Sequence, residues 1–326
     1  LYQAIHAGEL PRLLSSSATG NLYPLYQSND GQASTGEPHH TQFFQRDTYA
    51  IPQPAFFVGR QTELKALDHA IFHEQKHLIA VVGLGGQGKT ALVGHFVARL
   101  YQRNLSHGNR RANGQGHLSF QRVLWHSCQN TPSLSDILSY WLQQLSLPLP
   151  VGEVARAEQL LTSLLTYLHD EPVLFILDNF ESFLSAEKKA GAYRQESLEM
   201  EHLLDRFAAS THRGVLILTS REQPLTFARL ADNRAVKMLP LEGVTPAEAI
   251  QLLQHCELAG TAEEFATLAA RYSGNPLALK IVAETINELF AGDLPTFLQE
   301  ETLFVDDIRQ VLEQQFARLS SIEIDI

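Results

Sequence analysis

A lysine and a threonine stand together at the end of a glycine-rich stretch, AVVGLGGQGKTAL (residues 80–92). The glycines let the backbone turn without Cβ clashes, and the apolar run Leu78–Val82 before them predicts a buried parallel strand. The segment from Lys89 onward, KTALVGHFVARL, predicts a helix, so the turn leads into a helix N-terminus. Backbone N–H groups and the helix dipole favour an anion there. The stretch therefore predicts an anion site with one cation and one hydroxyl beside it.

The spacing Gly83-x-x-x-x-Gly88-Lys89-Thr90 is the P-loop pattern. In that motif the lysine reaches the β- and γ-phosphates of a nucleotide, and the threonine hydroxyl holds Mg²⁺. An accidental lysine in a tight strand–helix turn is the alternative, and the two flanking elements argue against it. The residues expected to bind the nucleotide phosphates are Gly83, Gly85, Gly86, Gln87, Gly88, Lys89, Thr90 and Ala91.

A second candidate group follows an apolar run in VLFILDNFE (residues 173–181). Because ligands of open α/β sheets collect at the carboxyl ends of the strands, we expect Asp178 at the same edge as the glycine-rich turn. Asp178 is then the Walker B acid, which holds Mg²⁺ together with Thr90. The alternative is an aspartate that only caps the turn after the strand.

A third candidate is Arg221, in VLILTSRE (residues 215–222), where another apolar run ends. A guanidinium fixed at this edge would sense a γ-phosphate, because arginine binds phosphate oxygens in a fork. An arginine after a strand is usually only solvated. Its order after the other two motifs favours the sensing role.

Strands alternate with helices through the middle of the chain, which predicts a parallel, doubly wound sheet. After Leu241 only helices are expected, and two of them open on capping boxes, at Thr245 with Glu248 and at Thr261 with Glu264. The fold class expected is thus an α/β P-loop NTPase followed by a small α-helical lid domain. Strands are expected at residues 78–82, 122–126, 173–177, 215–219 and 235–239, and helices at 62–72, from 89, 133–145, 157–168, from 245, from 261, 276–289 and 308–319.

The domain bounds follow from these elements. Residues 1–54 read as the tail of an upstream helix and a polar linker, 55–242 as the nucleotide-binding domain, and 243–320 as the helical lid. The polar segment 103–116 is expected to be a loop.

Two further motifs flank these three: FFVGRQTEL (residues 56–64) and GNPLALK (residues 274–280). The order Val-Gly-Arg, GxGGxGKT, hydrophobic-LD, hydrophobic-TSR and GxPLAL resembles the NB-ARC/NACHT-like STAND class of signalling ATPases, and the bacterial NB-ARC type in particular. The resemblance covers most of the chain, from about Pro54 to Leu319.

The resemblance implies that Val58, Gly59 and Arg60 line the adenine and ribose, that Pro276 packs on the adenine from the lid, and that Arg221 is the sensor arginine. It also implies an ATP/ADP switch with Mg²⁺. In such proteins ADP holds a closed monomer, and exchange for ATP opens it into a homo-oligomer that activates an effector. A sensor domain detects the trigger ligand.

The sequence departs from this family at two places. Many members carry a second acid directly after the Walker B aspartate, where this chain has Asn179, and Glu181 two residues later is a candidate substitute. Slow hydrolysis is therefore expected. The catalytic candidates are Lys89, Asp178, Asn179, Glu181 and Arg221. The segment 321–326 is expected to begin a winged-helix region, and that region and the sensor are expected outside the chain.

Composition narrows the class of protein. The formal net charge of −11 disfavours a general nucleic-acid binder. No apolar run approaches the roughly 20 residues that cross a bilayer, so no membrane contact is expected. Two distant cysteines in 326 residues predict a reducing, cytoplasmic setting. The first residue, Leu1, suggests a fragment. An AAA-type or DNA-dependent motor stays open as an alternative, and a P-loop kinase is a weaker one.

Overall fold

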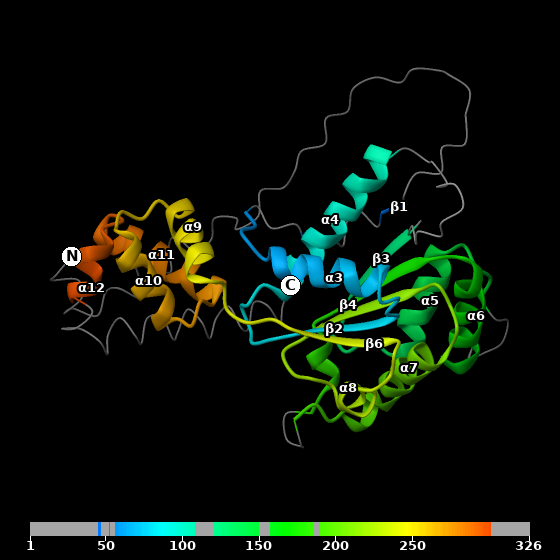
Figure 1. Cartoon of the computed structure of the whole chain (residues 1–326). Helices are drawn as coiled ribbons and strands as arrows, with labels where there is room; N and C mark the ends of the chain where they lie inside the picture. Colours follow the sequence, from blue (N-terminus) through cyan, green and yellow to red (C-terminus); the bar gives the residue numbers. More distant parts are fainter. Residues whose placement is uncertain are drawn as a thin grey trace, which may run out of the picture.

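The computed structural model describes residues 45–46, 52, 56–107, 120, 122–149, 157–185 and 190–300. Within these ranges a sheet is covered by helices on both faces, and a further group of helices stands beside it (Figure 1). The expected helices at residues 1–14 and 308–319, the linker before residue 45, and the segment 321–326 lie outside the described residues.

The sheet has the strand order β1-β3-β4-β5-β2-β6, and all its pairings are parallel. The five strands expected from the sequence are confirmed, each to within a residue or two. The short β1 lies in the stretch expected to be a linker, where it pairs with β3. The bounds are β1 Gln45–Arg46, β2 Leu78–Val82, β3 Arg122–Ser127, β4 Val173–Asp178, β5 Val215–Ser220 and β6 Val236–Pro240.

Alternate residues of the central strands β2, β3, β4 and β5 enter opposite cores. In β4, Phe175 and Leu177 pack with α5, α6 and α7 on one face, and Leu174 and Ile176 pack with α3 and α4 on the other. Burial on both faces explains the continuous apolar runs of these strands. The helices are α3 Gln61–Phe72, α4 Lys89–His107, α5 Leu134–Gln144, α6 Ala157–Asp170, α7 Leu198–Ala209 and α8 Leu225–Arg229, with 3₁₀ turns η1 Phe180–Phe183 and η2 Gln195–Ser197.

Two expectations for this part of the chain were incomplete. The polar segment was expected to begin at Arg103, but α4 continues to His107, because residues 103–107 contain no glycine or proline and Gly108 is the first after them. Helix α7 was not anticipated, although Met200, Leu203, Leu204 and Phe207 repeat at helical spacing on its buried side.

Between β6 and residue 300, where the described part of the chain ends, four helices follow, which we call the helical region: α9 Pro246–His255, α10 Ala262–Arg271, α11 Pro276–Phe290 and α12 Leu294–Glu300. This region has an apolar core of its own. Both expected capping boxes are present, at Thr245 with Glu248 and at Thr261 with Glu264. Helix α12 was not anticipated. In the described part of the chain, no helix combines the length and the apolar character needed to cross a membrane.

Candidate functional site

The glycine-rich turn lies between β2 and α4, as its motif predicts, and individual glycines are needed for different reasons. Gly86 and Gly88 take the positive φ angles 76° and 84°, which side chains disfavour. At Gly83 an added Cβ would lie 2.3 Å from the carbonyl oxygen of Leu241, so this position is closed by backbone. The turn therefore requires glycine at Gly86 and Gly88 because of their backbone conformation, and at Gly83 because of close packing.

The carbonyl oxygens of the turn accept hydrogen bonds from protein donors. Lys89 Nζ donates to Gly83 O (2.8 Å) and Leu84 O (3.0 Å). Donors from distant segments hold the next three carbonyls, and two of these donors belong to the helical region. They are Asn275 Nδ2 to Gly85 O (2.8 Å), Leu277 N to Gly86 O (3.2 Å) and Arg60 Nη2 to Gln87 O (3.1 Å). A loop held this way beside a helix N-terminus suits an anion bound through N–H groups.

Asp178 ends β4 next to the turn, as expected. It is 5% exposed, and its Oδ1 accepts hydrogen bonds from the hydroxyls of Thr90 (2.8 Å) and Thr219 (2.5 Å). Burial raises the pKa of this carboxyl above its usual range, against the lowering effect of the two hydroxyls. The structure thus brings together the two residues that the sequence predicts for Mg²⁺.

The donor set fits a magnesium ion. Mg²⁺ is usually bound through one or two side-chain oxygens, with nucleotide phosphates and water completing its shell. Thr90 and Asp178 supply two such oxygens at one place. The described residues contain no cluster of three His, Cys, Asp or Glu side chains that would hold a metal without a nucleotide.

Thr219 was not anticipated as a functional residue. Its hydroxyl donates to Asp178 and accepts from the backbone N–H of Asn179 (3.1 Å), so it links the ends of β5 and β4. The sequence signal was there: Thr219 is the first polar residue at the end of the apolar run in VLILTSR. Asn179 itself has φ 59°, a left-handed conformation that asparagine tolerates better than most residues.

Glu181 and Arg221 form an ion pair. Arg221 Nε lies 3.1 Å from Glu181 Oε1, and the backbone N–H of Arg221 donates to Glu181 Oε2 (3.2 Å). A Cβ added at Gly85 would lie 3.5 Å from Arg221 Cζ, so the guanidinium borders the glycine-rich turn. Arg221, the expected sensor, thus lies beside the glycine-rich turn. Glu181, the candidate base, contacts Arg221.

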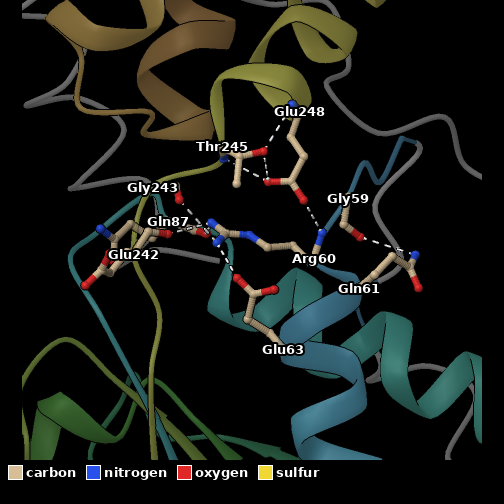
Figure 2. A network of polar contacts seen from close by, with 9 residues as sticks. All are labelled: Gly59, Arg60, Gln61, Glu63, Gln87, Glu242, Gly243, Thr245 and Glu248. Carbon is tan, nitrogen blue, oxygen red and sulfur yellow. Dashed lines mark hydrogen bonds and ion pairs between the residues drawn. The ribbon is translucent and has the colours of Figure 1, made fainter.

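Arg60 is the centre of a polar network (Figure 2). Its guanidinium is 5% exposed and donates to Glu63 and to the carbonyl oxygens of Gln87, Glu242 and Gly243. The expected nucleotide contact of Arg60 stays a prediction. What the structure shows is a bridge from the turn to the segment that leads into the helical region.

The segment before α3 also contacts both parts of the molecule. Phe56 stacks on His255 of α9, with ring centroids 3.6 Å apart, and Phe57 stacks on His95 of α4 at 4.1 Å. Val58 packs against the core of the helical region. The backbone N–H of Arg60 donates to Glu248 Oε1 (2.7 Å), and the backbone bonds from Thr245 and Arg60 hold the pKa of Glu248 below its usual value although burial acts to raise it.

The Glu248 carboxylate also leaves no room for a side chain at Gly59. Gly59 has φ 66°, and a Cβ added there would lie 1.9 Å from Glu248 Oε1. Pro276 is half-buried at the first position of α11, directly after Asn275. The expected adenine contacts of Val58, Gly59 and Pro276 stay predictions.

Comparison with known proteins agrees with this geometry. The family model described as "AAA domain" matches residues 73–224. A WD repeat-containing protein of Nostoc sp. is 34% identical over 298 residues, which are 90% of this chain. The chain spans only 23% of that relative. Residues 73–224 thus have the α/β fold of a P-loop NTPase and are similar to the AAA domain.

Several solved structures are similar to this chain at low identity. The Aeropyrum pernix ORC2 protein is 20% identical, with 76% of this chain and 66% of that one covered and a TM-score of 0.47. A STAND protein with a tetratricopeptide repeat sensor from Pyrococcus horikoshii is 20% identical (72% and 31% covered, TM-score 0.44). A Walker-type ATPase of Pyrococcus abyssi is 12% identical (86% and 80% covered, TM-score 0.48).

Proposed function

We propose that this chain is the nucleotide switch of a STAND-type ATPase: it binds ATP and ADP with Mg²⁺, hydrolyses ATP slowly, and passes the nucleotide state to the helical region. The observation that carries the proposal is the contact of α11 with the glycine-rich turn. Asn275 Nδ2 and Leu277 N donate to the carbonyls of Gly85 and Gly86. A change in the turn on phosphate binding therefore acts directly on the helical region.

A second connection supports the same coupling. Arg60 joins the turn, at Gln87 O, to the segment entering α9, at Glu242 O and Gly243 O (Figure 2). Its own backbone N–H is held by Glu248 of α9. The helical region thus meets the turn at the N-terminus of α11 and is tied to it near the N-terminus of α9. Two separate contacts constrain its orientation as well as its distance.

Slow hydrolysis agrees with the side chains near Asp178. A fast enzyme needs a group that deprotonates or orients the attacking water. Asn179 is neutral, and both carboxylate oxygens of Glu181 face Arg221. We propose turnover well below about 1 s⁻¹, the low end of typical enzymes.

In this proposal ADP favours the closed arrangement of sheet and helical region, and ATP favours an open one that assembles with copies of itself. The relative from Nostoc is named for WD repeats, the repeats that build β-propellers. We propose that a repeat domain of this kind senses the trigger ligand in the full-length protein.

The test is hydrogen exchange of the 326-residue chain alone, with ADP·Mg²⁺, and with a non-hydrolysable ATP analogue. ADP should slow exchange at residues 274–278 and raise the melting temperature, since a ligand bound only to the native state adds stability. The analogue should bind yet leave residues 274–278 less protected than ADP does. The N-terminus of α10 at Thr261 is the internal control, because its cap is made entirely within the helical region. Equal exchange at 274–278 under all three conditions would contradict the coupling.

A motor ATPase is the second candidate, and the match of residues 73–224 to the AAA domain model is the observation that favours it. A motor ATPase hydrolyses ATP rapidly, and its rate rises when the polymer along which it moves is added. Hydrolysis of many ATP per second, stimulated by DNA, would favour the motor and contradict the proposed switch.

A further inference from the structure

Glu181 has a fixed direction, and local structure sets it. Asn179 turns the chain sharply at φ 59° after β4, and η1 follows at once. Phe180 and Phe183 of this turn are 0% and 1% exposed, so both are anchored in the core. Ser182 Oγ donates to the carbonyl oxygens of Cys128 (2.5 Å) and Asn179 (2.8 Å). Between these anchors, Glu181 points to the end of β5.

The carboxylate is committed to one residue there. Its Oε1 contacts the side-chain Nε of Arg221, and its Oε2 accepts from the backbone N–H of Arg221. The Glu181 carboxylate therefore holds both the guanidinium and the backbone N–H of Arg221. The two side chains are only 20% and 33% exposed, so solvent screens the pair less than it screens a surface pair.

This geometry suits a positioning role better than general-base catalysis. A base must direct a carboxylate oxygen at the attacking water, within about 2.6–3.2 Å. A sensor arginine has a different need, because its long side chain loses rotamer freedom whenever it is held in one place. A sensor arginine therefore requires a partner that stabilises one rotamer. The Glu181 carboxylate, bonded to Nε, is such a partner and holds the guanidinium beside Gly85, at the glycine-rich turn.

We propose that Glu181 is a positioning residue that holds Arg221 in place to read the γ-phosphate, and that it is not the base for hydrolysis. This rests on the proposed function, in which Arg221 distinguishes ATP from ADP. Removing the carboxylate charge should therefore reproduce the defect of removing the guanidinium. The defect should appear in nucleotide discrimination and not only in turnover.

The experiment is calorimetric binding of a non-hydrolysable ATP analogue and of ADP to wild type, Glu181→Gln, Arg221→Gln and the double variant. Both single variants should lower the ratio of the two affinities roughly tenfold, the size of one charge-assisted hydrogen bond, with ADP affinity kept. The double variant should lose no more than either single one. Glu222→Gln is the matched control, because Glu222 lies beside Arg221 in sequence but accepts from Gly191 N (3.1 Å). An unchanged ratio in Glu181→Gln would overturn the proposal, and lost turnover with it would identify a base.

A nucleotide-free readout separates this proposal from the function it rests on. The ¹H–¹⁵N signal of the Arg221 side-chain Nε, assigned by its loss in Arg221→Gln, should exchange slowly with water in wild type and fast in Glu181→Gln. If that dependence holds while Arg221→Gln leaves the affinity ratio unchanged, the pairing stands and the sensing role of Arg221 fails. If the signal is indifferent to Glu181, the positioning role itself is wrong.

Discussion

The two ends of one sheet use buried polar side chains in opposite ways. At the carboxyl edge, Thr90 of α4 and Thr219 of β5 both donate hydrogen bonds to Asp178 at the end of β4. At the amino ends, His77 precedes β2 and His212 precedes β5, with ring centroids 4.8 Å apart, and the His212 ring meets Phe207 edge-on at 4.4 Å. One end gathers oxygen ligands around a loop, and the other packs imidazole rings like apolar groups.

The difference concerns what each end can do. Parallel strands direct the following loops to the carboxyl edge, where ligands of open α/β sheets bind. At the amino edge, His212 is 5% exposed, its Nε2 hydrogen-bonds to Phe207 O (3.0 Å), and its Nδ1 has no hydrogen-bond partner among the described residues. Burial, and then the neighbouring His77, lower the pKa of His212 to about 4. Changes at the carboxyl end should alter nucleotide chemistry, and changes at the amino end should alter stability alone.

The largest effect is expected from Lys89→Met. The ammonium is the charge that the glycine-rich backbone cannot supply to the transferred phosphate, and losing one such donor costs on the order of 10²–10³ in rate. ATP affinity should fall at least about tenfold as well. Single-turnover hydrolysis and calorimetry measure the two quantities.

Lys237→Met is the control for Lys89, since Lys237 lies on β6 and pairs with Glu74. If Lys89→Met kept normal affinity and rate, the P-loop assignment would be wrong.

The next effect belongs to the amino end and depends on pH. In the unfolded chain a histidine takes up its proton near pH 6.5, but folded His212 does so only near 4. Its unfolded form therefore binds more protons between these values, so stability falls as pH falls through this window. The loss reaches about 3 kcal/mol below pH 4, given 1.36 kcal/mol per pH unit.

The measurement is denaturant unfolding at pH 7, 6, 5 and 4 for wild type and His212→Gln. As pH falls from 7 to 4, the free energy of unfolding should decrease more for wild type than for His212→Gln. The nucleotide affinities of the two proteins at pH 7 should be equal. His169→Gln is the matched control, since the His169 side chain is 69% exposed. A parallel pH dependence in wild type and His212→Gln would refute the role of His212.

Sequence reasoning reached the local features of the carboxyl end, made no prediction for the two histidines of the amino end, and missed the contacts that join distant segments. The turn, the strand ends and the two capping boxes follow from neighbouring residues, and each was found where its motif predicts. The bond from Asn275 to Gly85 joins residues 190 positions apart, and no local pattern encodes it. The sequence offered Glu181 as a candidate base, but the direction of its side chain depends on the left-handed turn at Asn179, and spacing alone does not give that turn.

Thr219→Val tests whether the carboxyl end needs its internal hydrogen bonds. Valine keeps the shape but cannot donate to Asp178 or accept from Asn179 N. Mg²⁺-dependent turnover should fall roughly tenfold, as expected when a hydrogen bond to a charged group is lost. Affinity for ADP without Mg²⁺ should not change.

The control for Thr219 is Thr226→Val, another buried threonine, whose hydroxyl bonds to the Tyr193 hydroxyl (2.7 Å) away from the turn. It should lose stability and keep turnover. The comparison fails if both valine variants lose turnover equally.

The smallest effect is expected at the contact between the carboxyl end and the helical region. Asn275→Ala removes the cap of α11, whose side chain accepts from Leu277 N and Ala278 N, and this should cost about 1 kcal/mol of stability. Thr261→Ala removes the cap of α10 and should cost a similar amount. The two variants differ in one respect, because only Asn275 also donates to the glycine-rich turn, at Gly85 O. Urea unfolding should therefore rank them together, whereas ADP-dependent protection of residues 274–278 should fall in Asn275→Ala alone. If Thr261→Ala abolished that protection equally, the helical region would respond to its own stability and not to the turn.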